Sequence, residues 1–199
     1  MKRTKTGSVE VKNFKIRNIS IGIVGTSPLI VHAFSEKARK MIEDKQQGKS
    51  KNAKHALRVP EEDFESAKHK SPLGWDGFPA AGFKAAMTRG AKMIGLVMKD
   101  VQTNFFIQAD CSETQLVKIN GKCRMRTDMV RIGMGSADVR YRPEYPKWTA
   151  TLVIEFNEGM VSLEQIYQMV SAAGYGVGVG EMRPERTKFG FGRFTLKKL

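Results

Sequence analysis

Residues 174–194 read GYGVGVGEMRPERTKFGFGRF, and this stretch decides the fold that we expect. Glycine recurs at every second position from 174 to 180 and returns at 190 and 192, with valine or an aromatic residue between. Such alternation is typical of strands, and glycine lets a backbone approach a ligand with no side chain in the way. We expect a glycine-rich hairpin with an open flat face and the cationic tip MRPERTK. The alternative from these residues, a tight hairpin packed under a helix, stays open.

The overall charge points in the same direction. The 199 residues carry a formal net charge of +14, which is the electrostatic footprint expected of a nucleic-acid binder. A membrane surface would attract the same charge, but no stretch approaches the roughly 20 apolar residues of a spanning helix, and no signal peptide is apparent. The two cysteines, Cys111 and Cys123, fit unpaired thiols of a cytosolic protein better than one disulfide, and they lack the partners of a zinc site. We expect a cytoplasmic protein with no metal, no cofactor and no membrane partner.

The pattern along the chain predicts an α+β protein. Residues 9–25 are β-rich, and a turn leads to a short continuation at 29–31. The lysine-rich residues 35–72 contain few large apolar side chains and predict an exposed, partly mobile insertion that begins with a helix capped by Ser35. The elements expected next are a helix over 80–98, a strand over 101–109, strands 115–119 and 122–132 joined by an Asn120-Gly121 turn, a loop over 133–147, a strand over 148–156, and a helix that starts after Ser162 and stops at Gly174.

The order of these elements is strand, insertion, helix, strand, basic hairpin, strand, helix and strand hairpin. This is βαββαβ with additions, which predicts a modified ferredoxin-like fold with a basic hairpin and a mobile insertion. We expect residues 1–199 to form one domain, with the insertion at about 35–72.

Several basic residues are candidates for contact with nucleic acid. Lys84 and Arg89 lie in the first half of a helix, where free backbone N–H groups and the helix dipole favour phosphate. Around Tyr141 and Tyr145, arginines alternate with aromatic residues, a mixture that suits phosphate contact and base stacking, unless the tyrosines pack inward. The candidate nucleic-acid-binding residues are Lys84, Arg89, Arg124, Arg126, Arg131, Arg140, Arg142, Gly178, Gly180, Arg183, Arg186, Lys188, Gly190, Gly192 and Arg193.

Three segments together resemble the repeat-associated RNA-binding (RAMP) superfamily of CRISPR effector complexes. SPLIVH (27–32) resembles the short apolar segment that follows the first strand in those proteins. GFPAAGFKAAMTRGAK (77–92) is similar to the segment that opens their first helix, although alanines replace its small residues and its serines are absent. GVGVGEMRPERTKFGFGRF (176–194) resembles their C-terminal glycine-rich loop.

The resemblance implies a modified ferredoxin-like fold and, from the size and the middle insertion, the backbone subunit of the complex. Such subunits polymerise along a guide RNA, grip its phosphates, and assemble with other effector subunits. The resemblance places Lys84, Arg89 and the 176–192 loop near the RNA backbone. It makes the arm around Arg124 and Arg126, or the insertion, the thumb that kinks the strand.

Three functions stay open at this point. The first is a non-catalytic subunit that coats single-stranded nucleic acid, guide RNA above all, as a homo-oligomer within an antiviral ribonucleoprotein. The second is a metal-independent endoribonuclease that processes repeat RNA, with His32 as the candidate general base, although a histidine beside an apolar run is typically structural. The third is a protein that coats single-stranded DNA of a mobile element. Cleavage by an aspartate after the first strand is not expected, because residues 27–38 contain none.

Overall fold

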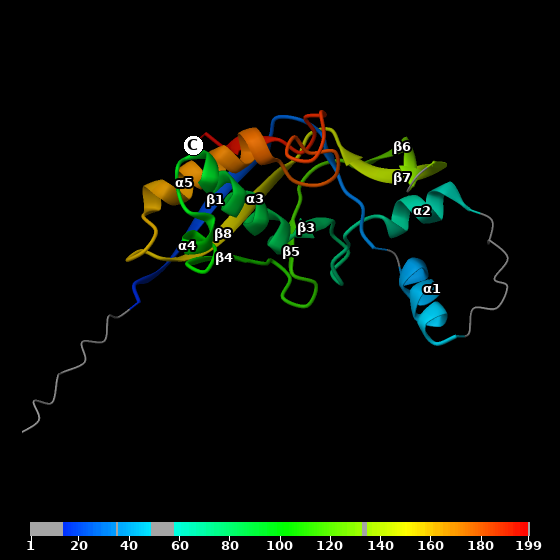
Figure 1. Ribbon diagram of the computed structural model, residues 1–199, viewed down its shortest axis with the longest axis horizontal. Coiled ribbons are helices and arrows are strands. Elements are labelled where there is room, and N and C mark those ends of the chain that lie inside the picture. Colours follow the sequence, from blue (N-terminus) through cyan, green and yellow to red (C-terminus); the bar gives the residue numbers. More distant parts are fainter. Residues whose placement is uncertain (1–13, 35, 49–57, 133–134, 199) are drawn as a thin grey trace, which may run out of the picture.

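The computed structural model describes residues 14–34, 36–48, 58–132 and 135–198, and its body is one four-stranded sheet (Figure 1). The strand order is β4-β8-β1-β9, and every neighbouring pair is antiparallel. The four strands are β1 (Ile16–Gly25), β4 (Phe105–Gln108), β8 (Thr149–Asn157) and β9 (Phe194–Leu196). One helix that packs on the sheet, Ala80–Met93, lies between β1 and β4, and another, Leu163–Ala172, lies between β8 and β9, which is the βαββαβ order of the ferredoxin-like fold. The predicted α+β fold is confirmed.

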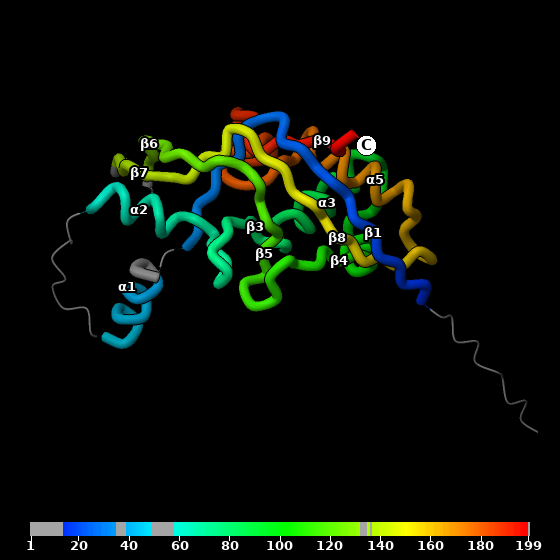
Figure 2. Tube along the Cα trace, turned by 180° about the vertical axis from the view of Figure 1, so that it is seen from behind, coloured from blue at the N-terminus to red at the C-terminus, as the bar shows by residue number. Residues whose placement is uncertain are grey.

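Two helices cover one face of this sheet (Figures 1 and 2), and they are α3 (Ala80–Met93) and α5 (Leu163–Ala172). Alternate residues of the central strands face these helices, so that Ile21, Ile23, Leu152 and Ile154 are buried. At Gly90 the helices approach closely, because a Cβ there would lie 2.7 Å from the backbone nitrogen of Ala173. The core therefore lies between the helices and the sheet.

The second helix confirms one predicted boundary and corrects the other. Ser162 forms a capping box with Gln165, which begins α5 as expected. The helix does not stop at Gly174, because it passes into a π-helical turn, η1 (Ala173–Val177), and ends at Gly178, where φ is +72°. Glycine is needed at 174 for packing, since a Cβ there would overlap the carbonyl oxygen of Phe194.

A second sheet extends from the body at the end where the basic hairpin lies (Figure 1). Its order is β2-β7-β6, formed by β2 (Leu29–Ile30), β6 (Arg124–Ile132) and β7 (Ser136–Tyr145). The expected loop over 133–147 is therefore wrong for the described residues 136–145. Charged residues alternate along β7 and form cross-strand ion pairs, and this hides the strand from a search for apolar alternation.

The predicted Asn120-Gly121 hairpin is also wrong. The strand before it, β5 (Leu116–Lys118), pairs with β3 (Gly77–Pro79), and Asn120 bridges to Thr149 of β8. A Cβ on Gly121 would overlap the carbonyl oxygen of Lys147, so that this glycine permits close packing rather than a two-residue turn. The basic hairpin is instead β6 with β7.

The remaining helices are short or lie in the predicted insertion. They are α1 (Glu36–Gln46), α2 (Pro60–Ser66) and α4 (Met98–Val101). The expected helix over 80–98 is wrong beyond Met93, because Gly95 adopts φ of +80° before α4 begins. The N-terminal half of the predicted first strand, residues 9–13, and the middle of the predicted insertion, residues 49–57, lie outside the described residues.

The predicted glycine hairpin has no strands in its two arms. From Gly178 to Arg193 the described backbone consists of turns and bends, and pairing resumes only at Phe194. We call residues 178–193 the C-terminal loop. Its glycines adopt positive φ at 178, 180 and 192, which is incompatible with a regular pleated strand.

Candidate nucleic-acid interface

The three sequence segments singled out above meet at one cavity of about 230 Å³. His32 lines it just after β2, Pro79 lines it from the end of β3, Arg89 lines it from α3, and Gly178 to Glu181 and Arg183 line it from the C-terminal loop. His69 and Phe78 complete the lining. The ferredoxin-like topology explains this convergence, because the end of β1, the start of α3 and the segment before β9 all lie at one end of the sheet.

Two larger hollows extend the cavity in both directions. One of about 550 Å³ lies over the outer face of α3 and shares Ala85 and Arg89 with the cavity. The other, of about 410 Å³, lies between α2 and β7 and shares His32. We call these three hollows, which adjoin through shared lining residues, the groove; their lining includes Lys84 on α3, residues of the C-terminal loop and Arg140 on the basic hairpin.

Backbone hydrogen bonds hold the C-terminal loop against the segment after β1. The N–H of Gly192 donates to the carbonyl of Pro28 over 2.8 Å, and the N–H of Glu181 donates to the carbonyl of Ile30 over 2.8 Å. Within the loop, the N–H of Val179 donates to the carbonyl of Gly192 over 3.0 Å. These hydrogen bonds therefore hold in place the side of the groove that the C-terminal loop forms.

The glycines of this loop face the protein. A Cβ on Gly180 would overlap the carbonyl oxygen of Ile30, and one on Gly192 would overlap that of Val179. Gly178 is equally enclosed, with Pro184 at 2.8 Å, whereas Gly190 is exposed. The expected open flat face is wrong at 178, 180 and 192, because the bare backbone there serves contact within the chain. A role of the loop in binding nucleic acid stays a prediction.

Glu185 lies between two of the predicted phosphate-binding arginines. Its Oε1 is 2.6 Å from Nε of Arg89, and its Oε2 is 3.3 Å from Nε of Arg183. Arg183 also donates from Nη1 to the carbonyl of Gly180 over 3.0 Å. A carboxylate thus occupies a position between two guanidinium groups that a phosphate would also suit.

Lys84 has a different environment. Its Nζ lies 4.0 Å from the centroid of the Phe106 ring at the edge of the sheet, and it forms no ion pair with any described residue. Burial lowers the pKa of this ammonium from its ordinary value. A phosphate that pairs with Lys84 in the groove therefore displaces no acidic side chain.

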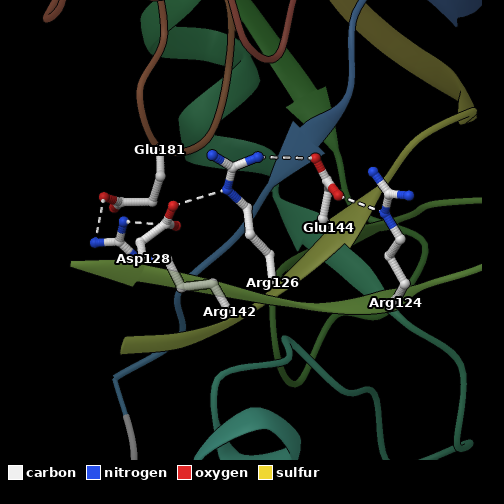
Figure 3. A network of polar contacts seen from close by, with 6 residues as sticks. All are labelled: Arg124, Arg126, Asp128, Arg142, Glu144 and Glu181. Atoms are coloured by element: carbon white, nitrogen blue, oxygen red, sulfur yellow. Dashed lines mark hydrogen bonds and ion pairs between the residues drawn. The ribbon is translucent and has the colours of Figure 1, made fainter. Parts of the chain in front are cut away.

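The basic hairpin carries a network of ion pairs that reaches the C-terminal loop (Figure 3). Arg142, whose side chain is 4% exposed, lies 3.4 Å from a carboxylate oxygen of Asp128 and 3.4 Å from one of Glu181. Arg126 bridges Asp128 at 2.8 Å and Glu144 at 3.2 Å. Arg124 lies 2.6 Å from Glu144, which confirms that Arg124 and Arg126 share one face of β6. Arg142 is buried between Asp128 on the hairpin and Glu181 on the C-terminal loop, and it therefore connects the loop to the hairpin.

The other predicted contacts lie nearer the solvent. Arg140 lines the groove and pairs with Asp138 at 3.5 Å. Arg131, Arg186 and Lys188 are exposed and form no ion pair with any residue that the structure describes. Arg193 donates from Nε to the carbonyl of Tyr175 over 3.1 Å.

At Tyr145 the structure selects the second of the two alternatives left open by the sequence, a tyrosine that packs inward. Tyr145 is fully buried, and its hydroxyl donates to Oδ2 of Asp76 over 2.8 Å. Burial, with the hydrogen bond to Asp76, raises the pKa of this phenol well above its ordinary value. Tyr141 is half-buried and lines the hollow between α2 and β7.

His32 and His69 share the central cavity, and the sequence predicted a role only for the first. Partial burial and the charges of Arg142 and Arg140 lower the pKa of His32. Burial and the charge of His32 lower the pKa of His69, whose ring makes an edge contact with Phe78. His69 lies in a lysine-rich stretch whose composition predicts an exposed segment, so the sequence did not indicate that His69 lines this cavity.

These two shifts predict how stability depends on pH. A histidine whose folded pKa is depressed binds protons more readily in the unfolded chain, so stability is full above pH 6.5 and declines as the pH falls below it. We expect the free energy of unfolding to fall between pH 7.5 and 5.0, and to fall less in the double variant His32→Gln/His69→Gln. Urea denaturation at stepped pH measures both slopes, and equal slopes in the two proteins would contradict the assignment.

Other site chemistries find no support among the described residues. No group of three His, Cys, Asp or Glu side chains there is placed to hold a metal ion, and Cys111 and Cys123 are unpaired. Among the described helices, none has the length and apolar character needed to cross a membrane.

Comparison with known proteins finds neighbours at the level of structure. No family model and no curated protein matches this chain. Cmr6 from Pyrococcus furiosus is similar over 93% of this chain and 100% of its own, with 14% identity and a TM-score of 0.44. A chain of the type III-B Cmr-beta complex bound to cognate target RNA is similar over 92% of this chain, with 12% identity and a TM-score of 0.48, and this chain spans 60% of it.

At TM-scores below 0.5, neither likeness bears on the geometry of the groove.

Proposed function

We propose that this chain is a non-catalytic subunit that binds single-stranded nucleic acid, guide RNA in particular. In this proposal several copies coat one strand and form the oligomeric backbone of a CRISPR-type ribonucleoprotein, with other effector subunits as partners. The RNA of the Cmr-beta complex belongs to that complex, and the proposal for this chain stands on its groove and its charge.

The observation that carries the proposal is the convergence of three distant segments on one cavity, with a further hollow adjoining it on each side. Residues near 32, residues 79–89 and residues 178–183 line the same cavity, and hollows on both sides lengthen it. An extended track suits a flexible single strand, whereas a compact pocket suits a small molecule. The net charge of +14 supplies the attraction that a polyanion needs.

The distribution of cations along the groove favours contact with the sugar-phosphate backbone. Lys84 and Arg89 lie on α3, Arg183 lies on the C-terminal loop, and Arg140 lies on the hairpin. Cations spaced along a track position a strand but carry no sequence information. We therefore propose binding that is strong at low salt and indifferent to sequence.

The double variant Lys84→Ala/Arg89→Ala tests this assignment. We expect its affinity for a 30-nucleotide RNA to fall about tenfold or more in 0.1 M salt, because two groups that neutralise phosphates are lost. The slope of log K against log salt should become shallower by about 1.4, which is 0.7 for each phosphate on a single strand. Fluorescence anisotropy with RNAs of two unrelated sequences measures both quantities.

A matched control removes the same charge elsewhere. Lys122 and Lys147 are exposed and line none of the three hollows, so the variant Lys122→Ala/Lys147→Ala should retain the slope of the wild-type protein to within about 0.7. A loss that differs between the two RNA sequences would contradict a phosphate role for Lys84 and Arg89. Preference for unlabelled DNA over RNA as competitor would move the proposal to the DNA-coating function.

A further inference from the structure

Exposed aromatic side chains occur in the C-terminal part of the chain that also lines the groove. The side chains of Tyr175 on η1 and Phe189 on the C-terminal loop are among the most exposed aromatic ones, at 69% and 58%. Phe189 contacts Phe191, with ring centroids 6.2 Å apart. Tyr175 lies three residues before Gly178, which lines the groove, and a Cβ on Gly178 would lie 3.1 Å from the carbonyl oxygen of Phe191. The segments that carry these rings therefore adjoin the groove at Gly178.

Each ring system is paired with a cation. The guanidinium of Arg193 lies 5.0 Å from the centroid of the Tyr175 ring, and that of Arg126 lies 4.9 Å from the Phe191 ring. Arg193 is itself anchored, because its backbone N–H donates to Oγ of Ser27 over 2.9 Å and its Nε donates to the carbonyl of Tyr175. These contacts restrain Tyr175 and Phe191, whereas the side chains of Tyr175 and Phe189 remain largely exposed.

Unpaired cations stand beside the rings as well. Lys188 directly precedes Phe189 and Arg186 lies three residues before it; both are exposed and have no ion-pair partner within the described part of the chain. Single exposed aromatic residues are ordinary on protein surfaces and need no explanation. Rings interleaved with fixed arginines and free cations are different, because single-stranded nucleic acid offers both a base to stack and a phosphate to pair.

We propose that Tyr175 and Phe189 stack against unpaired bases of the bound strand where it leaves the groove over the C-terminal loop. The proposal rests on the proposed function and adds to it a second kind of contact, made to bases rather than to phosphates. Arg193, Arg186 and Lys188 pair with the phosphates that flank the stacked bases. Stacking tolerates any base, because every base has a π-face, and purines offer the larger one.

Two variants keep apolar volume but remove the aromatic ring, Tyr175→Leu and Phe189→Leu. Each is expected to weaken binding of oligoadenylate by about 5- to 100-fold, as loss of one stacked base predicts, and to leave the salt slope unchanged because no charge is lost. Phe14→Leu is the matched control, since Phe14 is 74% exposed at the opposite end of β1 and should bind as the wild-type protein does. Phe189→Trp should retain affinity, and its fluorescence should be quenched by the oligomer.

An abasic oligomer of the same length separates the two kinds of contact. The wild-type protein and the leucine variants should bind this sugar-phosphate chain equally, because it has nothing to stack. Equal affinity for oligoadenylate in wild type and variants, or an equal loss on the abasic oligomer, would overturn the stacking proposal. Failure of the wild-type protein to bind either oligomer at low salt would instead overturn the proposed function.

Discussion

Gly192→Val is expected to destabilise the protein by about 3 kcal/mol or more, an effect typical of a forced backbone clash. Gly192 adopts φ of +67°, where a β-branched residue is strained by its own backbone. A Cβ there would also overlap the carbonyl oxygen of Val179. Moving Val179 away would break the hydrogen bond from its N–H to the carbonyl of Gly192. Urea denaturation followed by circular dichroism measures the loss.

Gly190→Val provides the matched control two residues away. Gly190 is exposed, does not adopt positive φ, and would bring its Cβ no closer than 3.8 Å to the flexible side chain of Arg193. We expect a change within about 0.5 kcal/mol, as for other surface substitutions. If both variants were as stable as the wild-type protein, the close packing of Gly192 against Val179 within the C-terminal loop would be refuted.

Asp128→Ala is expected to cost about 3 kcal/mol, because it leaves the buried guanidinium of Arg142 without its enclosed partner (Figure 3). Glu181 alone would then face Arg142, and its side chain is 43% exposed to water. Removal of one member of a buried ion pair is costly since the other charge stays desolvated. Thermal and urea denaturation would measure the loss.

Glu158→Ala is the control for this variant. Glu158 pairs with Arg17 at 2.6 Å, but both side chains are exposed, so that removal should cost at most about 1 kcal/mol. Equal costs for Asp128→Ala and Glu158→Ala would show that the network on the hairpin is no more enclosed than a surface pair. The C-terminal loop would then lack its proposed attachment to the basic hairpin.

The ferredoxin-like body could be predicted because its elements obey simple periodicities. The strands that became β1 and β8 alternate apolar and polar residues, and Ser162 with Gln165 marks the start of α5 without ambiguity. The topology then brings residues near 32, 79–89 and 178–183 together. The sequence identified these segments as candidates, but it could not show that they contact one another. Lys84 and Arg89 were chosen because the first half of a helix was expected there, but Arg89 lies in the second half of α3. Contact of either residue with nucleic acid stays a prediction.

The hairpin and the loop could not be predicted for a shared physical reason. In β7 the residues that face neighbouring strands are Arg142 and Glu144, so ion pairs take the place of the apolar side chains that a strand pattern requires. In the C-terminal loop, glycine at alternate positions matched the sequence pattern of a strand, but three of these glycines adopt positive φ in tight turns. Glu185 and His69 owe their positions to long-range folding, which leaves no local trace in the sequence.

The most direct test of the groove as a site for single-stranded nucleic acid is a gel-shift titration of end-labelled RNA with the full chain at low ionic strength. The account predicts a retarded complex that weakens steeply with added salt, and labelled RNA that is recovered intact. RNA and DNA that both migrate freely at every protein concentration would contradict the binding claim, and recovery of cleaved RNA would contradict the non-catalytic one.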